Sequence, residues 1–544
     1  MHFMKYNCSY ASLFLLSLGA CQFRKEEVKK PNIVMFLTDD NAFWYWGFGG
    51  GPKLSPAIDS LAAEGVVCTQ MYCSAPVSTP SRYSIHTGKY AGRCLSSFFT
   101  KKFPEGVPYN IEWNTDLDEG REITMAMVFR EAGYMTGFVG KWHLGMGGAD
   151  TLFQFNRDDD PADPQVDRKL KAYQQYMIEI VKKNGFDYAA SIVPSNNDVH
   201  PVERLRYHNL DWYAKGAIDF IRERAKDKTP FFLIVNITTH HGPCHEESID
   251  QDIRVTQAGY VEGLEGILPP RKSIYKRIKE KGYEVNFKTA GTVWTDDCVR
   301  AIVDELKKRG MEQNTAVVFT TDHNRYDGKG TCYQGGVHIP FLMKYPGVIK
   351  PGSQCKVRMQ LPDLFPSFAA MCGIVLPDTL KIDGINMWPA LRGDSSFCRH
   401  DTLYFEFGYT RAVLCGDYKY IAFRLPPDKI DAMKNGKVQK AYNYSGTLAS
   451  SPAMARYPHY FEPEQLYNIR EDEGEQNNLA FLPEYADKLK EMKEILKMKL
   501  STFRNPFPID SVDPFYFSET YKILCEKARK LDIDQYYWYQ KECY

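Results

Sequence analysis

Short apolar runs alternate with helix-like segments along most of the chain. The apolar runs Ile33–Leu37, Met135–Val139, Phe231–Ile237 and Ala316–Thr320 have no polar alternation, which is typical of strands buried on both faces of a parallel sheet. Helical spacing of apolar residues appears between them, at Ala57–Ala63, Thr124–Ala132, Trp212–Ala225 and Trp294–Lys308. The pattern predicts an α/β fold in which helices sandwich a large mixed, mostly parallel sheet.

The pattern changes near residue 400. Leu403–Phe407 and Arg411–Phe423 alternate in the manner of antiparallel strands, with a turn at Gly416-Asp417, and Pro483–Leu500 has one apolar helical stripe. We therefore predict a large catalytic domain over residues 31–395 and a smaller C-terminal α+β subdomain, built on an antiparallel sheet, over 396–500. An aromatic-rich tail over 501–544 is expected to pack on the large domain.

The N-terminus resembles a bacterial lipoprotein signal. Lys5 precedes the apolar run Ala11–Leu18, which is too short to span a bilayer as a helix, and Leu18-Gly19-Ala20-Cys21 resembles a lipobox. We predict a signal peptide over residues 1–20, lipidation of Cys21 and a charged tether over 21–30. The protein would then be exported and attached to the bacterial envelope, periplasmic or surface-exposed, by its lipid alone; an ordinary signal peptide ending near a cysteine is the alternative.

Composition removes several classes of protein. Lys+Arg and Asp+Glu are both 68 among 544 residues, and this neutral balance argues against a nucleic-acid binder. A hydrophobic fraction of 44% excludes a largely disordered chain. The mean hydropathy of −0.42 and the single long apolar run exclude a multi-span membrane protein. Fourteen cysteines without a C-x-x-C pair argue against a zinc ribbon or thioredoxin motif, and their spacing fixes no disulfide pairing.

Charged residues follow each predicted strand. Asp39-Asp40, Lys141 with His143, His240-His241 and Asp322-His323 come directly after the four apolar runs. Since ligands of open α/β sheets bind beyond the carboxyl ends of the strands, these side chains are expected to meet at one edge. An Asp-Asp pair alone is more often a turn than a metal site, and only the joint occurrence predicts a catalytic centre.

A nucleophile candidate lies in the segment Cys73–Arg93. Pro80 is favoured in the first turn of a helix, and Ser78 or Thr79 is expected to cap that helix. A nucleophile at a helix N-terminus lies where the backbone N–H groups and the helix dipole favour negative charge. A Ser-capped helix without chemistry is the alternative.

Ser78-Thr79-Pro80-Ser81-Arg82 resembles the sulfatase signature, in which Cys or Ser stands two residues before Pro and four before Arg. Gly133–Gly145, Thr320–Pro340 and Leu466–Ala480 are also similar to type I sulfatases, which belong to the alkaline-phosphatase-like superfamily. The resemblance runs from about Pro31 to about Leu500. It implies the alkaline-phosphatase-like fold and the activity of a sulfuric ester hydrolase.

The resemblance implies that Ser78 is oxidised to formylglycine (3-oxoalanine) before export, by a serine-type radical S-adenosylmethionine maturase. One hydroxyl of the hydrated aldehyde attacks sulfur, and the other then expels sulfate. The family's metal ligands match Asp39, Asp40, Asp322 and His323, an oxygen-rich set suited to Ca²⁺. His323 is the least typical ligand, because many relatives have Asn there.

The resemblance also assigns the remaining site residues. Arg82 would hold the formylglycine, Lys141 and Lys329 would contact the sulfate, His143 would act as a base, and His241 would protonate the leaving oxygen. His240 is the fallback for His241. Three residues depart from the family pattern in the loop that carries Lys329, namely Asn324, Gln334 and His338.

The expected substrate is a sulfated glycan. Candidate sugar contacts in the C-terminal subdomain are Glu406, Tyr409, Arg456 and His459, for which an ordinary surface or packing role is the alternative. Two other functions stay open: a phosphodiesterase or phosphonate monoester hydrolase of the same superfamily, and a non-catalytic binder of sulfated glycans with unmodified Ser78. The glycines of Gly47–Gly51 lack the spacing of a dinucleotide fingerprint.

Overall fold

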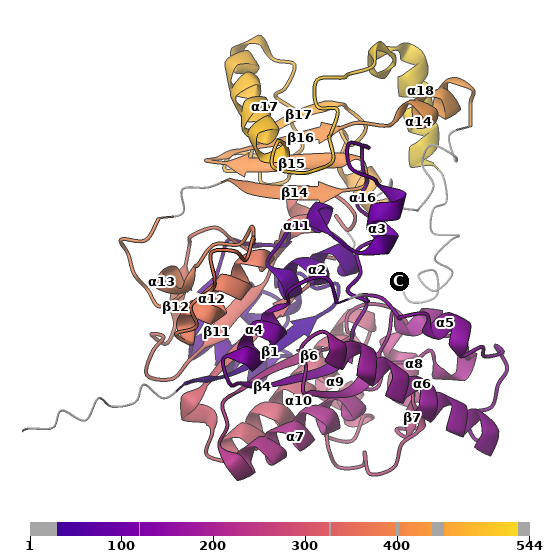
Figure 1. Ribbon diagram of the computed structural model, residues 1–544, viewed down its shortest axis with the longest axis vertical. Coiled ribbons are helices and arrows are strands. Elements are labelled where there is room, and N and C mark those ends of the chain that lie inside the picture. The colour runs from indigo at the N-terminus through magenta and orange to yellow at the C-terminus, as the bar shows by residue number, and fades with distance from the viewer. Residues whose placement is uncertain (1–29, 119, 326–327, 399–401, 438–450, 531–544) are drawn as a thin grey trace, which may run out of the picture.

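The computed structural model describes residues 30–118, 120–325, 328–398, 402–437 and 451–530 (Figure 1). The predicted signal peptide, the lipidated Cys21 and nearly all of the tether lie outside these residues, as do residues 531–544 of the tail. Across the described ranges, none of the helices combines the length and the apolar character that crossing a membrane requires.

A mixed sheet of eight strands forms the centre of the body, in the order β12-β2-β11-β9-β1-β6-β4-β5. Its strands are β1 (Asn32–Thr38), β2 (Val66–Cys68), β4 (Met135–Lys141), β5 (Tyr188–Val193), β6 (Phe231–Asn236), β9 (Thr315–Thr321), β11 (Phe341–Lys344) and β12 (Ser353–Cys355). The five strands β9, β1, β6, β4 and β5 are mutually parallel, and β11 runs antiparallel to β9 and β2. The predicted mostly parallel sheet is confirmed.

Both faces of this sheet are covered by helices, because alternate side chains of each strand enter separate cores. In β1, Ile33, Met35 and Leu37 pack in one core and Val34 and Phe36 in the other, all with no exposed surface. Burying a large apolar side chain stabilises the fold by about 1.5–3 kcal/mol. The first core also holds α2 (Ser78–Thr87), α4 (Met125–Glu131), α6 (Pro164–Lys183) and α12 (Leu364–Met371); the second holds α1 (Pro56–Ala63), α7 (Leu210–Asp227) and α10 (Phe287–Lys308).

Helix starts depend on local side-chain caps. Thr124 caps α4 as predicted, since its hydroxyl accepts a hydrogen bond from the Met127 N–H at 3.2 Å. Helix α10 begins at Phe287 rather than at the predicted Trp294. The reason is a capping box, in which the Asn286 side chain accepts from the Thr289 N–H and the Thr289 hydroxyl accepts from the Asn286 N–H.

A second, four-stranded antiparallel sheet lies above the body in Figure 1. It contains β14 (Leu403–Phe407), β15 (Thr410–Cys415), β16 (Tyr418–Phe423) and β17 (Glu464–Asn468), and β15 turns into β16 at Gly416-Asp417 as predicted. Helix α17 (Ala486–Leu500) packs against β15 and β16, and the final described helix is α18 (Glu519–Arg529). The sheet is tied to the body by the Glu406 N–H, which donates to the Ser74 carbonyl at 3.0 Å.

Candidate active site

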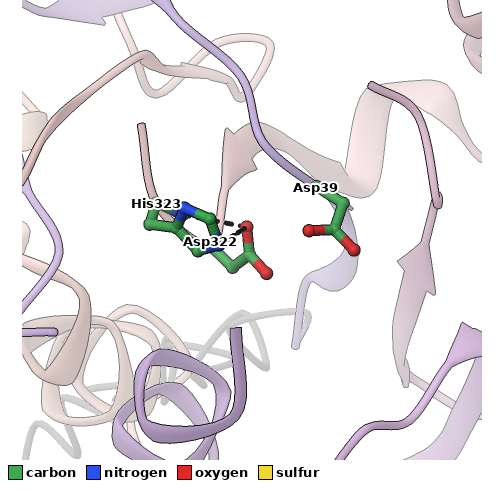
Figure 2. A group of neighbouring side chains, drawn as sticks. All are labelled: Asp39, Asp322 and His323. Carbon is green, nitrogen blue, oxygen red and sulfur yellow. Dashed lines mark hydrogen bonds and ion pairs between the residues drawn. The ribbon is translucent and has the colours of Figure 1, made fainter. Parts of the chain in front are cut away.

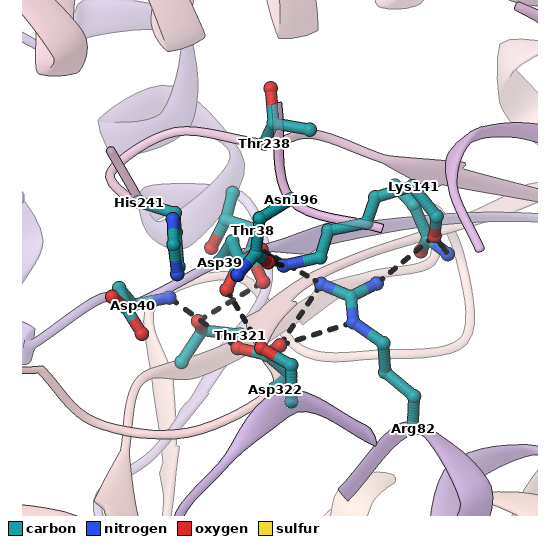
Figure 3. Close-up of polar contacts among 12 residues, drawn as sticks. Thr38, Asp39, Asp40, Arg82, Lys141, Asn196, Thr238, His241, Thr321 and Asp322 are labelled. Carbon is teal, nitrogen blue, oxygen red and sulfur yellow. Dashed lines mark hydrogen bonds and ion pairs between the residues drawn. The ribbon is translucent and has the colours of Figure 1, made fainter. Parts of the chain in front are cut away.

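The carboxyl ends of the parallel strands bring the predicted residues together. Asp39 and Asp40 follow β1, Lys141 ends β4, His241 follows β6, and Asp322 follows β9. Figure 3 shows these side chains converging on one point, with Arg82 reaching them from α2. The edge predicted from the charge pattern is therefore the place where the charged groups meet.

Arg82 and Lys141 neutralise the carboxylates at the centre. The Arg82 guanidinium lies 3.0 Å from Asp322 and 3.5 Å from Asp39, and none of the three side chains is exposed. Lys141 contacts Asp39 as well and donates to the Asn196 side-chain oxygen at 2.5 Å. Burial opposes ionisation of Asp39, but the charges of Lys141 and Arg82 offset it and hold the pKa of this carboxyl well below its usual range. Asp39 is therefore an anion at neutral pH.

Asp40 lies between Lys329 and His323. The Lys329 ammonium is 2.7 Å and 2.9 Å from the two Asp40 oxygens. Although burial opposes it, the pKa of Asp40 falls to about 2, because Lys329 and His323 favour the anion. The structure thus places Lys329, from the loop with the three unusual residues, directly at the cluster.

The Asp39, Asp322 and His323 ligand atoms lie within 4.8 Å of one another (Figure 2). His323 Nδ1 is 2.8 Å from the Asn324 carbonyl, which only accepts, so Nδ1 carries the proton. The other nitrogen, Nε2, faces Asp40 at 3.2 Å and Asp322 at 3.7 Å. The carboxylate oxygens of this group are the donors that a hard cation such as Ca²⁺ prefers, and the imidazole nitrogen is the less typical third donor.

Ser78 lies beside this ligand cluster. Its Oγ is 3.1 Å from Asp39 Oδ1 and 3.2 Å from His323 Nε2. The prediction that Ser78 or Thr79 caps the helix is wrong: Ser78 is the first residue of α2, and the cap position is Val77, which has no side-chain bond. A cap at residue 78 would accept from the N–H of residue 80 or 81. Pro80 has no N–H, and the Ser81 N–H donates to the Val77 carbonyl at 3.2 Å, while the Ser78 hydroxyl faces the cluster.

Two of the three histidines considered for catalysis, His143 and His241, lie in the site, whereas His240 is held within the fold. The buried His241 ring lies against Gly242, with Nδ1 3.1 Å from its carbonyl, and burial lowers its pKa to about 3. Burial, Lys141 and Arg82 lower the pKa of His143 well below its usual value. Both rings are therefore neutral in the substrate-free site at neutral pH. The fallback choice of His240 is wrong, because its nitrogens contact Asn41 at 2.7 Å and the Lys288 carbonyl at 3.2 Å within the fold.

Two further polar residues enter the site from the loop after β5. Asn196 contacts Lys141, and Asp198 is 2% exposed with no hydrogen-bond partner for either carboxylate oxygen within the described part of the chain. Burial raises the pKa of Asp198 to about 6, against the opposing charge of Lys141. The signal was present in the sequence, since this loop also follows a strand, but Tyr188–Val193 was not recognised as one.

Asp198→Asn is expected to stabilise the protein at pH 8 and to leave it nearly unchanged at pH 4. The folded-state pKa of about 6 exceeds the unfolded value of 3.8, so the native state resists ionisation and loses stability as pH rises between these values. The Asn variant lacks this penalty of up to about 3 kcal/mol. Urea unfolding at both pH values measures the difference, and equal stabilisation at pH 4 and pH 8 would contradict the assignment.

The predicted sugar contacts of the C-terminal subdomain behave differently from one another. Glu406 is fully buried and accepts hydrogen bonds from the Gly92 N–H and the Tyr109 and Tyr404 hydroxyls, so its prediction as a sugar contact is wrong. His459 is held by Glu462 at 2.9 Å. Arg456 is exposed and lines a large cavity next to the catalytic cluster.

Hydrogen bonds hold the three residues of the Lys329 loop that depart from the sulfatase pattern. The Asn324 amide donates to the His338 carbonyl at 2.7 Å, and His338 Nε2 lies 2.9 Å from the Thr69 carbonyl. The Gln334 side-chain oxygen accepts from Lys419 at 3.2 Å, and Lys419 is paired with the buried Glu475. The departures from the sulfatase pattern therefore build a connected network.

Comparison with known proteins decides the family. The sulfatase family model matches residues 31–374, which is more than half of the chain. The chain belongs to the sulfatase family. It is thus a sulfuric ester hydrolase of the type I sulfatase superfamily, with the alkaline-phosphatase-like fold that the resemblance predicted.

Several curated relatives of this protein are themselves named as sulfatases. An ulvan-active sulfatase of Formosa agariphila is 25% identical over 510 residues, covering 89% of this chain and 84% of the relative. An endo-4-O-sulfatase of Bacteroides thetaiotaomicron is 24% identical over 416 residues, covering 69% and 77%. The crystal structure of Ps i-CgsB superposes with a TM-score of 0.59 at 20% identity, covering 93% of this chain and 98% of that one. The same protein in complex with k-i-k-neocarrahexaose gives 0.57 at 20% identity, covering 92% and 98%.

Proposed function

We propose that this sulfatase removes sulfate from a sulfated carbohydrate, using formylglycine derived from Ser78 and a Ca²⁺ ion held by Asp39, Asp40, Asp322 and His323. The observation that carries the proposal is the position of Ser78 Oγ, between Asp39 and His323 at the start of a buried helix. The glycan-directed names of the relatives support the substrate class. We further propose that a radical S-adenosylmethionine maturase modifies Ser78, and that the protein is exported and lipid-anchored through Cys21.

Each charged residue has a defined task in this proposal. The bound Ca²⁺ supplies Lewis acidity toward a sulfate oxygen, and formylglycine supplies a geminal diol as nucleophile. Arg82 offsets the negative charge of the carboxylates, with its guanidinium 3.0 Å from Asp322. Lys141, beside Asp39, and Lys329, beside Asp40, would present positive charge to the oxygens of the transferring sulfate group. Both ammonium groups are close enough to the carboxylates to exchange that contact for the ester.

The two site histidines handle protons. His241 Nδ1 lies 3.1 Å from the Gly242 carbonyl and donates to it, so Nε2 is the ring nitrogen that would carry the proton that the leaving alcohol requires. A bound sulfate ester adds negative charge beside this buried ring and raises its pKa from the low value of the empty site. His143, neutral because of burial and the neighbouring Lys141 and Arg82, is suited to accept a proton from the second hydroxyl of the diol.

The mass of the tryptic peptide Leu54–Arg82 tests the cofactor directly. Protein made together with a serine-type maturase should yield this peptide lighter by two hydrogens at Ser78, or its hydrate, and should release sulfate from 4-nitrophenyl sulfate faster than phosphate from the matched phenyl phosphate. An unmodified Ser78 in protein that nevertheless hydrolyses the sulfate ester would overturn the formylglycine assignment. Faster release of 4-nitrophenol from bis(4-nitrophenyl) phosphate than from 4-nitrophenyl sulfate would favour the phosphodiesterase alternative.

His241→Ala is expected to slow poor leaving groups far more than good ones. An alkoxide leaving from a sugar needs the proton, whereas 4-nitrophenolate leaves without it. We expect a loss of about 10²–10⁴-fold on a sulfated sugar and less than about tenfold on 4-nitrophenyl sulfate. The ratio of kcat/KM values on the two substrates is the measurement, with His240→Asn as the control for a neighbouring ring. Equal losses on both substrates would argue against His241 as the acid.

A further inference from the structure

A cavity of about 1180 Å³ lies beside the catalytic cluster without including it. Its walls come from the 3₁₀ segments Phe43–Tyr45 and Gly47–Gly49, the start of α10, the loop after β9 and the C-terminal subdomain. The lining contains none of the carboxylates, lysines or histidines assigned to sulfate transfer. The cavity and the catalytic centre therefore share no lining residue, and the catalytic roles assigned above do not account for the cavity.

Aromatic side chains form one wall of this cavity. Trp44 is 47% exposed although it is among the largest apolar side chains of the protein, and its ring packs edge-on against Tyr45 at 4.5 Å. Phe287 and Tyr457 also line the cavity. An exposed, rigidly held indole beside polar groups is the arrangement that binds the apolar face of a sugar ring while leaving its hydroxyls to polar neighbours.

Basic side chains lie over these rings. The Lys288 ammonium is 4.3 Å from the Trp44 ring centre, and the Arg325 guanidinium is 4.3 Å from that of Phe287. Burial and the charge of Arg325 together lower the pKa of Lys288, so the two cations are near enough to repel each other. An anion placed between them would relieve this repulsion, and sulfate suits the flat donor array of arginine.

The cavity is connected to the catalytic centre through the backbone. Asn324 and Arg325 directly follow His323, and the His240 ring links Asn41 at 2.7 Å to the Lys288 carbonyl at 3.2 Å. The cavity also adjoins a second hollow of about 780 Å³. The two share four lining residues, namely Thr69, Gln334, His338 and Glu473. The second hollow adds Lys356, Arg358 and Arg470 to its lining. Together the two hollows form a groove that leads away from the reaction centre.

We propose that the Trp44–Lys288–Arg325 cavity binds an anionic sugar unit of the polysaccharide other than the one that loses its sulfate. The exposed part of the Trp44 indole contacts that unit beside Lys288, which lies over the ring, and Lys288, supported by the charge of the largely buried Arg325, holds its sulfate or carboxylate. The sulfatase then recognises a chain of several sugars rather than a monosaccharide. This inference rests on the proposed function for its substrate class, but its binding prediction does not depend on turnover.

Binding to a catalytically inactive protein provides the test. In a Ser78→Ala background, hexasaccharides and disaccharides of chondroitin sulfate, ι-carrageenan and ulvan are titrated by calorimetry, with desulfated hexasaccharides alongside. We expect at least one sulfated hexasaccharide to bind, and Trp44→Ala and Lys288→Ala each to raise its Kd about tenfold without changing the Kd of the disaccharide. Lys276→Ala, an exposed lysine outside the cavity, is the control and should have no effect.

The outcomes separate the cavity from the reaction. The inference is overturned if no hexasaccharide binds, if the desulfated hexasaccharide binds as tightly, or if both cavity variants bind like the parent. Matured enzyme carrying Trp44→Ala or Lys288→Ala should hydrolyse 4-nitrophenyl sulfate at the parental rate while losing kcat/KM on the hexasaccharide. If matured enzyme hydrolyses no sulfate ester but the binding pattern holds, the proposed function fails and the cavity assignment stands.

Discussion

Replacing Ser78 with alanine is expected to lower kcat/KM for 4-nitrophenyl sulfate by about 10⁵-fold, the size of effect seen when an enzyme loses its nucleophile. The methyl group cannot be converted to formylglycine and offers no oxygen to sulfur. Within the described residues, the hydrogen bonds of Ser78 Oγ go to Asp39 and His323 of the charged cluster, so the fold should be retained. Thermal unfolding and sulfate release on the same sample are the measurements.

Thr79→Val is the matched control for Ser78→Ala. Thr79 is the next residue of α2, is equally buried, and its hydroxyl has no hydrogen-bond partner within the described residues. We expect this variant to be matured and to keep activity within a few-fold of the parent. If Ser78→Ala retained substantial turnover while Thr79→Val lost it, the nucleophile would have to be sought at another position.

Asp322→Asn should cost about 10³-fold in kcat/KM and should abolish stabilisation by Ca²⁺. The substitution keeps the shape of the side chain but removes the negative charge that both the cation and Arg82 require, with Arg82 only 3.0 Å away. Because this leaves a buried guanidinium less well balanced, the unfolding temperature should fall as well. The decisive measurement is therefore the shift in Tm when CaCl₂ is added, not Tm itself.

Asp383→Asn provides the comparison for Asp322→Asn. Asp383 is a partly buried residue whose side chain is 7% exposed, and it pairs with Arg93 at 2.7 Å in a different part of the body. It should lower Tm to a similar extent, yet preserve both the Ca²⁺-dependent shift and the activity. A Ca²⁺-dependent shift that survived in Asp322→Asn would contradict its role as a ligand.

The site residues that could be predicted from the sequence are those that follow the carboxyl ends of the parallel strands. Asp39, Lys141 and Asp322 each come directly after an apolar run, so a one-dimensional pattern locates them once the strands are taken as parallel. Asp198 obeys the same rule but was missed, because Tyr188–Val193 is half-buried and less uniformly apolar than the other strands. The predicted Ser78 cap is not formed because the helix begins one residue earlier than expected: Val77 holds the cap position, and its carbonyl accepts from the Ser81 N–H at 3.2 Å.

Other features depend on contacts that no local pattern contains. Glu406 looked like a surface carboxylate, but it is buried because β14 packs on the segment around Gly92 and Tyr109, about three hundred positions earlier in the chain. The aromatic and basic lining of the cavity comes from segments near residues 44, 288, 325 and 456, and only the folded chain brings these together. Sequence spacing alone gives no reason to group them.

Asn324 connects the predicted cation ligand His323 with the wall of the neighbouring cavity. Its carbonyl accepts the Nδ1 proton of His323 and so fixes the direction of the imidazole, while its side chain donates to His338 in the wall of the glycan cavity. If a cation and a glycan bind as proposed, Asn324 is the residue through which each would affect the affinity for the other, because coupling between two binding sites is reciprocal. Variants selected for another polysaccharide would then be expected to differ in calcium affinity as well.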